Sequence, residues 1–296
     1  MKNILIIGAN GFTGRRILND LSVNPIYHVT GCSLRDDICP GKDYRFVRTD
    51  IRDENEVRKL FKECRPDIVI NTSALSVPDY CETHHAEAEA TNVTAVETIA
   101  HVCEQYGSRF IHLSTDFVFD GKSTRLYKEE DEAIPVNYYG VTKLKAEKII
   151  ASICSNYAIV RVVVVYGKAL PGQHGNILQL VANRLRNGET IRVVSDQWRT
   201  PTFVGDISVG VEKLMFHTAN GIYHICGSEC LTITEIAYRV ADFLKLDRSL
   251  IEPVTTEEMK EVTPRPRFSG LSIEKAKAEI GYTPRTLEEG MEASLF

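Results

Sequence analysis

The stretch NILIIGANGFTGRR, residues 3–16, decides the fold. An apolar run ends at Gly8, and Gly11 and Gly14 follow at intervals of three residues. A glycine turn between a buried strand and a helix lets the backbone approach a diphosphate, and the helix amino end offers free N–H groups and a favourable dipole. A glycine triplet alone is weak evidence, but this one opens the chain and begins a strand–helix–strand pattern. It therefore predicts a dinucleotide-binding turn.

The alternation of apolar strands and amphipathic helices continues through the first half of the chain. Strands are predicted at residues 3–8, 28–33, 44–48, 67–71, 109–114 and 157–165, and helices at 11–20, 55–64, 86–106 and 138–155. Continuous apolar strands between such helices indicate a parallel sheet covered on both faces. The sequence thus predicts an α/β fold, a Rossmann-type doubly wound parallel sheet with a smaller C-terminal α/β substrate lobe.

The domain boundaries follow from where this regularity weakens. We assign residues 1–167 to the dinucleotide-binding domain, with parts of 191–225 returning to it. Residues 168–190 and 226–296 form the expected substrate-binding lobe. Ligands bind at the carboxyl edge of such sheets, which is where this lobe is expected to lie.

The composition is that of an ordinary globular chain. Its 296 residues include 40 acidic and 35 basic ones, and the formal charge of −5 argues against a general nucleic-acid binder. Eight cysteines are scattered without a C-x-x-C pair, as in a reducing compartment. No apolar stretch approaches the ~20 residues that cross a bilayer. We therefore expect a soluble, cytoplasmic protein without a metal site.

The end of the second predicted strand bears on the choice of cofactor. An acidic residue there would bind a free ribose hydroxyl, whereas an arginine suits a 2′-phosphate. Ser33 and Arg35 stand there instead of an acid, and Arg15 follows the last glycine. NADP(H) is the preferred cofactor and NAD(H) stays open, because Arg35 and Arg15 can equally be solvated surface charges.

The cofactor-binding residues are predicted from the strand ends and the catalytic helix. Asp50 and Ile51 follow the third strand, where the acid can accept from the adenine amino group, and small residues follow the fourth strand. The predicted set is Gly8, Asn10, Gly11, Phe12, Thr13, Gly14, Ser33, Arg35, Asp50, Ile51, Ser73, Ala74, Asn92, Tyr139 and Lys143.

A tyrosine–lysine pair begins the helix that follows the fifth strand. The i, i+4 spacing places Tyr139 and Lys143 on one helix face. An ammonium lowers the pKa of a neighbouring phenol, and the pair can then deliver a proton as a hydride arrives. Thr115, at the end of the fifth strand, can hydrogen-bond a substrate carbonyl. Elsewhere Y-x-x-x-K is usually a surface pair and such a threonine a turn cap, but the position in a dinucleotide fold favours catalysis.

These residues resemble those of the extended short-chain dehydrogenase/reductases, and within that group the dTDP-4-dehydrorhamnose reductases. The matching segments are Ser114–Gly121, Tyr139–Glu147, Ser195–Val204, Gly221–Ile225 and the tail motif R-P-x-x-S-x-L that starts at Arg265. The resemblance covers essentially the whole chain. It implies reduction of C4 of dTDP-4-dehydro-6-deoxy-L-mannose to dTDP-L-rhamnose by NADPH or NADH.

The resemblance also implies roles for individual residues. Tyr139 would donate the proton, Lys143 would hold the nicotinamide ribose and tune Tyr139, and Thr115 would orient the ketone. Asn92 would support the site. Candidate substrate-binding residues are Ser76, Asp79, Thr115, Asp116, Asn176, Arg199 and Arg265. On chemical grounds, Arg199, Arg265 and Arg267 are hypothetical ligands of the diphosphate, and salt bridges within the small lobe are an equally open interpretation. For partners we expect a nucleotide sugar, no nucleic acid and no membrane, and a homodimer is left open.

The chain departs from the family pattern at several places. Residues 161–166 lack the tryptophan that often lies beside the sugar, and Arg199 stands where glycine is frequent. Arg16 lies about where some relatives carry a magnesium-binding glutamate at a dimer interface. These departures leave the chemistry intact but keep the sugar, and any metal, open.

Two other functions compete with a reductase. Related dehydratases carry a glutamate where Phe117 stands, and related epimerases use an acid at the second strand end, which is absent here. A non-catalytic dinucleotide-binding subunit, like the regulatory subunit of methionine adenosyltransferase, is the alternative outside enzymes. The intact Thr115, Tyr139 and Lys143 argue against it.

Overall fold

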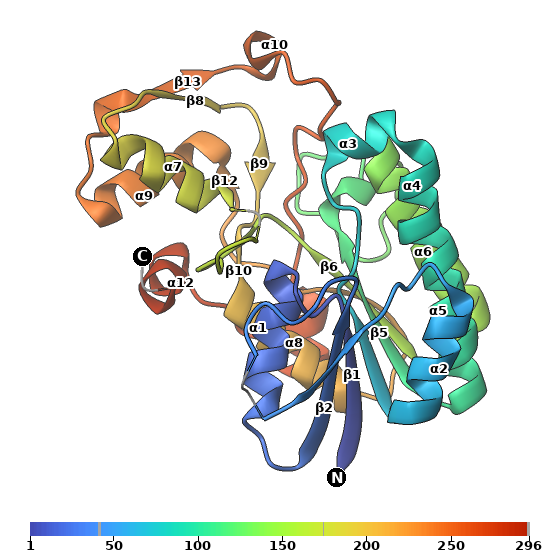
Figure 1. The fold of residues 1–296 in the computed structure, drawn as a ribbon. Helices are drawn as coiled ribbons and strands as arrows, with labels where there is room; N and C mark the ends of the chain where they lie inside the picture. Colours follow the sequence, from blue (N-terminus) through green and yellow to red (C-terminus); the bar gives the residue numbers. More distant parts are fainter. Residues whose placement is uncertain (41–42, 174, 295–296) are drawn as a thin grey trace.

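A seven-stranded parallel sheet forms the centre of the molecule. The computed structural model describes residues 1–40, 43–173 and 175–294. The strands lie in the order β11-β6-β5-β4-β1-β2-β3, which confirms the predicted doubly wound topology (Figure 1). Their bounds are β1 Lys2–Ile7, β2 Tyr27–Ser33, β3 Arg45–Arg48, β4 Ile68–Asn71, β5 Arg109–Thr115, β6 Tyr157–Val162 and β11 Gly221–His224.

Helices cover both faces of this sheet because its strands are apolar on both sides. Ile4 and Ile6 of β1 pack with helices α1 (Phe12–Ser22), α8 (Val204–Phe216) and α11 (Glu274–Ile280). The alternating residues Leu5 and Ile7 pack with α2 (Glu54–Cys64), α5 (Ala95–Tyr106) and α6 (Tyr138–Ile153). Two apolar layers therefore hold the sheet in place.

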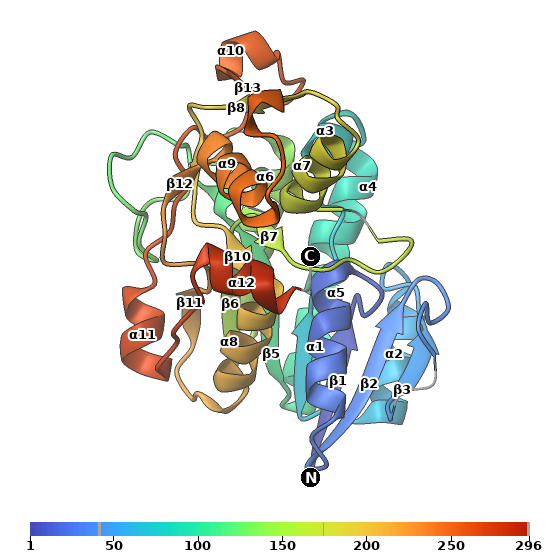
Figure 2. The ribbon, with the colours of Figure 1, turned by 90° about the vertical axis from the view of Figure 1, so that its left-hand side faces the viewer.

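A second group of elements has an apolar core of its own beyond the carboxyl ends of the strands. Helices α7 (Ile177–Arg186), α9 (Ile233–Leu244) and α12 (Leu287–Ala293) share this core with the parallel pair β8 (Ile191–Val194) and β13 (Ile251–Val254). Helix α10 (Thr256–Met259) follows β13. Figures 1 and 2 show this group above the end of the sheet opposite the N-terminus. The short pairs β7 (Val165–Tyr166) with β10 (Thr202–Phe203) and β9 (Trp198–Arg199) with β12 (Leu231–Thr232) connect it to the sheet.

Two predicted elements are wrong in their length. The strand expected to run to residue 165 ends at Val162, because Val164 has a φ of 37°, a left-handed conformation that a β-branched residue adopts only under strain. The Thr202 N–H bonds the Val164 carbonyl at 3.1 Å, and its hydroxyl bonds the Val163 carbonyl at 2.6 Å, so β10 holds this bend.

The helix predicted at residues 86–106 is interrupted as well. It consists of α4 (His85–Glu89), the π-helical turn η1 (Ala90–Thr94) and α5, and α3 (Pro78–Thr83) precedes it. The apolar pattern continues through the interruption, which is why the pattern alone predicts one helix. A π-helical turn often marks a functional site, and η1 carries Asn92.

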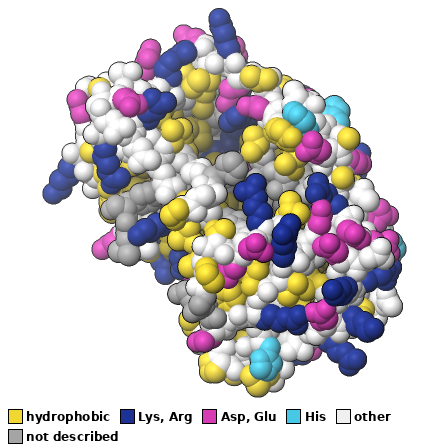
Figure 3. Space-filling model, viewed as in Figure 1, with side chains coloured by type: hydrophobic (Ala, Val, Ile, Leu, Met, Phe, Trp, Pro, Cys, Tyr) yellow, Lys and Arg dark blue, Asp and Glu magenta, His cyan; other side chains and the backbone are white. Residues whose placement is uncertain are grey.

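In the described residues, no helix is both long enough and apolar enough to cross a membrane. Figure 3 shows acidic, basic and apolar side chains interspersed over one face of the molecule.

Candidate active site

The glycine turn after β1 is packed tightly against the end of β4. A Cβ at Gly14 would lie 2.3 Å from the Gly8 carbonyl oxygen, and one at Gly8 would lie 2.7 Å from the Ser73 nitrogen. Gly8 also has a φ of 84°, which favours glycine. Gly11 precedes α1 without a side-chain cap, and the first turn of α1 has no acidic residue. The amide groups of this helix end are therefore suited to an anionic ligand such as a diphosphate.

Arg15 and Arg35 have opposite environments. Arg15 is buried, and its guanidinium bonds Asp37 at 2.5 Å, Tyr44 at 2.7 Å and Asn10 at 2.7 Å. Burial acts to raise the pKa of Asp37, but hydrogen bonds from the Cys39 N–H, Tyr44 and Arg15 outweigh burial and lower this pKa. The interpretation of Arg15 as a solvated surface charge is wrong. Arg35 is exposed beside Asn10, whose amide donates to the Arg35 carbonyl at 3.2 Å.

Asp50, the predicted adenine ligand, is engaged by its own turn. Arg52 Nη2 lies 2.6 Å from Asp50 Oδ2, and this hydrogen bond lowers the pKa of the carboxyl. Ile51 lies against the apolar layer of α2 and α5. Ser33 ends β2, and Ser73 and Ala74 follow β4, so these predicted residues do lie at the carboxyl ends of neighbouring strands.

The catalytic helix is pressed against the turn that follows β5. Asn137 caps α6 by accepting from the Gly140 N–H at 2.9 Å. A Cβ at Gly140 would lie 2.1 Å from the Phe117 carbonyl oxygen, so only glycine allows this approach. As a result Tyr139 packs edge-on against Phe117, with ring centroids 6.0 Å apart. The sequence Y-G-x-x-K thus brings its tyrosine to the end of the fifth strand, as predicted.

Thr115 and Asp116 lie at this strand end in a closed hydrogen-bond group. The Thr115 hydroxyl accepts from the Phe117 N–H at 3.2 Å and donates to Asp116 Oδ1 at 3.1 Å. Asp116 is buried, accepts from the Ser269 hydroxyl, and lies 3.7 Å from Arg199 Nε. Burial raises the pKa of Asp116, and Arg199, Ser269 and Thr115 oppose this rise. Thr115 therefore caps this turn and also lies within hydrogen-bonding reach of Tyr139.

The pKa of Tyr139 moves in the direction opposite to the sequence-based expectation. Burial raises the pKa of the phenol, the charge of Asp116 raises it further, and a hydrogen bond with Thr115 lowers it. Lys143 does not lower the pKa of Tyr139, because its Nζ faces the Leu113 carbonyl and His112 instead. A phenol with a raised pKa stays protonated at neutral pH and is suited to donate a proton.

Lys143 is buried against β5. Its Nζ donates to the Leu113 carbonyl at 2.7 Å and lies 2.9 Å from His112 Nε2. Burial lowers the pKa of Lys143 to about 8, and the charge of Glu147 acts in the other direction. The sequence reasoning missed His112, since a histidine inside an apolar strand gives no signal of its own.

Asn92 connects the loop after β4 to the catalytic helix. Its Oδ1 accepts from the Leu75 N–H at 2.8 Å, and its Nδ2 donates to the Leu75 carbonyl at 3.0 Å and to the Thr142 hydroxyl at 3.0 Å. The π-helical turn places this wholly buried amide between the two elements. Its position agrees with a supporting role rather than with direct contact to a ligand.

The predicted substrate residues fall into three groups. Ser76 and Asp79 lie in or before α3, and Asp79 Oδ2 lies 3.8 Å from Arg265 Nη2. Asp116 and Arg199 form the buried pair described above, and Arg199 also donates to the Trp198 carbonyl at 2.8 Å and to Gln197 at 3.0 Å. Asn176 caps α7 and donates to the Gly167 carbonyl at 2.8 Å.

The tail motif encloses this end of the sheet. A Cβ at Gly121, whose φ is 77°, would lie 2.6 Å from Pro266 Cα, so the two motif segments touch along their backbones. Asn137 Nδ2 donates to the Pro264 carbonyl at 2.9 Å. Ser269, which sequence reasoning used only as part of the resemblance, thereby reaches Asp116. No group of three His, Cys, Asp or Glu side chains that could hold a metal is found among the described residues.

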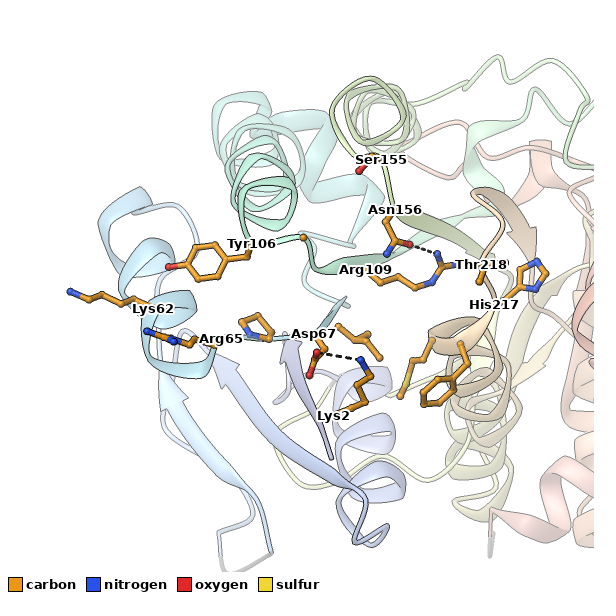
Figure 4. Close-up of a pocket in the computed structure, with 15 residues that line it drawn as sticks. Lys2, Lys62, Arg65, Asp67, Tyr106, Arg109, Ser155, Asn156, His217 and Thr218 are labelled. Carbon is orange, nitrogen blue, oxygen red and sulfur yellow. Dashed lines mark hydrogen bonds and ion pairs between the residues drawn. The ribbon is translucent and has the colours of Figure 1, made fainter.

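A hollow at the opposite edge of the sheet is a poor alternative site. It has a volume of about 730 Å³ and is lined by several basic residues, among them Lys2, Lys62 and Arg65 (Figure 4). The carboxyl ends of α2, α5, α6 and α8 lie at this edge, and cations stabilise such ends. Arg109, for example, donates to the Leu214 carbonyl in the last turn of α8 at 2.7 Å. The hollow's basic side chains are therefore explained by the fold.

The fold and the groups at the carboxyl edge of the sheet define a class of protein. A doubly wound sheet, a glycine turn before α1 and a Tyr–Lys pair beside a strand-end threonine are the features of an extended short-chain dehydrogenase/reductase. Residues 1–295 match the family described as RmlD substrate binding domain, and the chain belongs to that family.

Three similar proteins show how broad the family is. A probable low-salt glycan biosynthesis reductase from Haloferax volcanii is 30% identical over 97% of this chain and 95% of its own length. The methionine adenosyltransferase 2 subunit beta of Xenopus laevis is 31% identical over 96% of this chain and 84% of its own. The crystal structure of dTDP-4-dehydrorhamnose reductase from Bacillus anthracis in complex with NADP has a TM-score of 0.87 and 26% identity, covering 100% and 99% of the two chains.

Proposed function

We propose that this chain reduces the C4 ketone of a nucleotide-linked sugar with NADPH, and that its substrate is dTDP-4-dehydro-6-deoxy-L-mannose, which becomes dTDP-L-rhamnose. The observation that carries the proposal is the approach of Tyr139 to the end of β5 beside Thr115, made by Gly140. The substrate is suggested by the name of the solved relative from Bacillus anthracis.

The chain's own groups supply the proton chemistry. A reduced dinucleotide would supply the hydride to the ketone carbon, and the ketone oxygen would take the proton of the Tyr139 phenol. Tyr139 is protonated at neutral pH, as a proton donor in a reduction must be. Thr115 would orient the ketone once its hydroxyl turns from Asp116, 3.1 Å away, towards the substrate.

The cofactor would lie across the glycine turn and the strand ends. The free amide groups at the start of α1 fit the diphosphate, and Asn10 shapes the loop that carries Arg35. Arg35 and Ser33 are the residues for a 2′-phosphate, since Arg15 is already occupied by Asp37. NADP(H) is therefore the proposed cofactor, with NAD(H) as a weaker substitute.

The diphosphate of the sugar nucleotide would meet Arg265 at the mouth of the site. Arg265 is about one third exposed, and its nearest carboxylates, Glu261 at 3.3 Å and Asp79 at 3.8 Å, are at loose ion-pair distances. Arg267 is more exposed but is paired with Glu257 and Asp196. Arg199 is wholly buried, so its part would be to hold Asp116 rather than to reach a phosphate.

The test is oxidation of NADPH in the presence of the keto sugar, followed by the loss of reduced-nicotinamide absorbance. Tyr139→Phe removes the proton donor and should lower kcat by about 100-fold or more. Tyr138→Phe is the matched control, because Tyr138 is the preceding residue and its hydroxyl bonds Glu89 outside the site at 3.1 Å. Equal loss in both variants, or no loss in Tyr139→Phe, would contradict the assignment of the donor.

A second candidate is a dinucleotide-binding regulatory subunit, favoured by the 31% identity to methionine adenosyltransferase 2 subunit beta. NADPH binding without turnover on any 4-keto sugar nucleotide would support it. Turnover of a different sugar would keep the reaction and change only the substrate.

A further inference from the structure

A buried chain of three side chains connects the end of β4 to the catalytic helix. Asn71 Nδ2 lies 3.1 Å from His112 Nδ1, and His112 Nε2 lies 2.9 Å from Lys143 Nζ. All three side chains are buried. The directions of these two hydrogen bonds restrict how many protons the three groups can hold.

The backbone fixes the orientation of Asn71. Its Oδ1 accepts from the Ser73 N–H at 3.0 Å, and a backbone N–H can only donate. The Ser73 hydroxyl donates to the same oxygen at 2.6 Å. The amide nitrogen therefore faces His112, and because an amide nitrogen only donates, His112 Nδ1 must be the acceptor.

The tautomer of His112 follows from this. A neutral imidazole with an unprotonated Nδ1 carries its proton on Nε2, which faces Lys143. An ammonium at Lys143 has no lone pair, so it would oppose this N–H donor to donor. If the proton moved to Nδ1, the same conflict would arise against Asn71. Every contact is satisfied only when Lys143 accepts from His112 as an uncharged amine and donates to the Leu113 carbonyl.

We propose that His112 is a positioning residue of the reductase site, locked by Asn71 in the Nε2–H tautomer so that its N–H faces Lys143 and favours the uncharged amine over the ammonium. The role of Lys143 as a cofactor ligand rests on the proposed function, but the tautomer and the amine do not. Burial lowers the pKa of His112 well below its usual range, and Lys143 lowers it further whenever it carries the ammonium charge. Burial likewise lowers the pKa of Lys143 to about 8.

The charged groups around α6 come from the elements that pack on it, and Glu104 of α5 accepts from the Ser155 N–H at 2.7 Å, at the other end of the helix from Lys143. Glu147 on the same helix favours the ammonium of Lys143. The Glu147 carboxylate is, however, already paired, because it accepts two hydrogen bonds from Arg161 of β6 and a third from the Ser114 hydroxyl of β5. Asp116 of η2 (Asp116–Val118) faces Tyr139 rather than Lys143. Glu82 of α3 and Glu89 of α4 bond the backbone and hydroxyl of Tyr138. The residue of η1 that contacts α6 through a hydrogen bond is Asn92, an uncharged amide that donates to the Thr142 hydroxyl.

Ligand binding should therefore be coupled to the uptake of one proton by Lys143. A ligand that offers several hydrogen-bond acceptors to Lys143 favours the ammonium, so binding is coupled to protonation of the amine. Its affinity should be full below the pKa of Lys143 and fall as pH rises above it. Loss of the Nε2–H donor removes a group that favours the amine, so the pKa of Lys143 rises and the fall in affinity moves to higher pH.

The direct test is the ¹⁵N spectrum of the histidine rings in the chain without added nucleotide, since the two tautomers have distinct ring-nitrogen shifts. His112 should show the Nε2–H form throughout pH 6–9, the range that brackets the value of about 8 for Lys143. His224 is an internal control with the opposite expectation, because its Nδ1 lies 3.1 Å from the Ser272 carbonyl and must carry the proton. A protonated Nδ1 on His112 would overturn the proposal.

A substitution at Asn71 should reverse the tautomer of His112. Asn71→Asp replaces the amide donor with a carboxylate, which accepts from His112 Nδ1–H and turns the Nε2 lone pair towards Lys143. The ¹³Cε signal of Lys143, assigned with Lys143→Met, should then titrate about one pH unit higher or more. A rise in pKa without a change of tautomer would mean that charge alone acts, and would overturn the role of His112.

A binding measurement separates this inference from the proposed function. NADPH affinity, followed by its fluorescence, should fall at higher pH in His112→Asn than in the wild type, whereas His224→Asn should follow the wild type. The expected tautomer without any NADPH binding would leave the His112–Lys143 geometry correct and reject the cofactor site. Tight NADPH binding with identical pH profiles in all three proteins would reject the role of His112 alone.

Discussion

At the scale of single residues, the site depends on which polar groups are free and which are already paired. Arg15 and Arg35 look equivalent in the sequence, yet only Arg35 is exposed, because Asp37 and Tyr44 enclose Arg15. No local pattern could have shown this, since the contact joins residues separated by 22 positions. The same holds for His112, whose partners come from a neighbouring strand and a helix.

Arg35→Ala should weaken NADPH selectively. Loss of a charge-assisted bond to the 2′-phosphate should raise KM for NADPH about tenfold and leave KM for NADH unchanged. Steady-state assays with both cofactors measure this, and Arg58→Ala, on the exposed face of α2 and paired with Glu54, is the control. An equal rise for both cofactors would show that Arg35 does not read the 2′-phosphate.

At the scale of elements, the sequence predicted which segments are helices and strands better than where they are interrupted. The glycine turn, the Tyr139–Lys143 helix and the parallel strands follow from short-range patterns. The left-handed Val164 and the π-helical turn at Asn92 do not, because both are held by contacts with other elements: Thr202 in one case and Leu75 with Thr142 in the other. Both interruptions occur beside the candidate site.

Gly140→Ala should separate activity from folding. The added Cβ would lie 2.1 Å from the Phe117 carbonyl, so the start of α6 must move and take Tyr139 away from Thr115. We expect kcat to fall about 100-fold, as for a misplaced catalytic group. Circular dichroism should show an unchanged helix content, and Lys148→Ala, exposed on the same helix, should keep full activity. Full activity of Gly140→Ala would contradict the close approach.

At the scale of the whole molecule, the two edges of the sheet carry different kinds of groups. The carboxyl edge collects the glycine turn, the strand-end hydroxyls and the catalytic helix, as the topology alone predicts. The opposite edge collects helix ends and the cations that stabilise them. How the tail closes over Asp116 through Ser269 could not be predicted from spacing, because 153 residues separate the two.

The buried histidines of the sheet should make stability depend on pH. Burial lowers the pKa of His224 to about 3, from the ordinary value of 6.5. Unfolding below pH 6.5 therefore takes up a proton, so this contribution to stability is present above pH 6.5 and is lost as pH falls towards 3. Urea unfolding of the wild type and His224→Asn should show a steeper loss in the wild type between pH 6.5 and 4. Parallel curves would contradict it.

The proposed function requires hydride to pass from a reduced nicotinamide to the C4 carbon of a keto sugar nucleotide in this site. The most direct measurement is a turnover with NADPH deuterated at the transferred position, followed by mass spectrometry and NMR of the sugar product. We predict one deuterium at C4 of the product and one NADPH oxidised per sugar in the wild type, and product formation about 100-fold slower or more in Tyr139→Phe. A product without deuterium, or a sugar converted without net oxidation of NADPH, would contradict a reductase and favour an epimerase that recycles its cofactor.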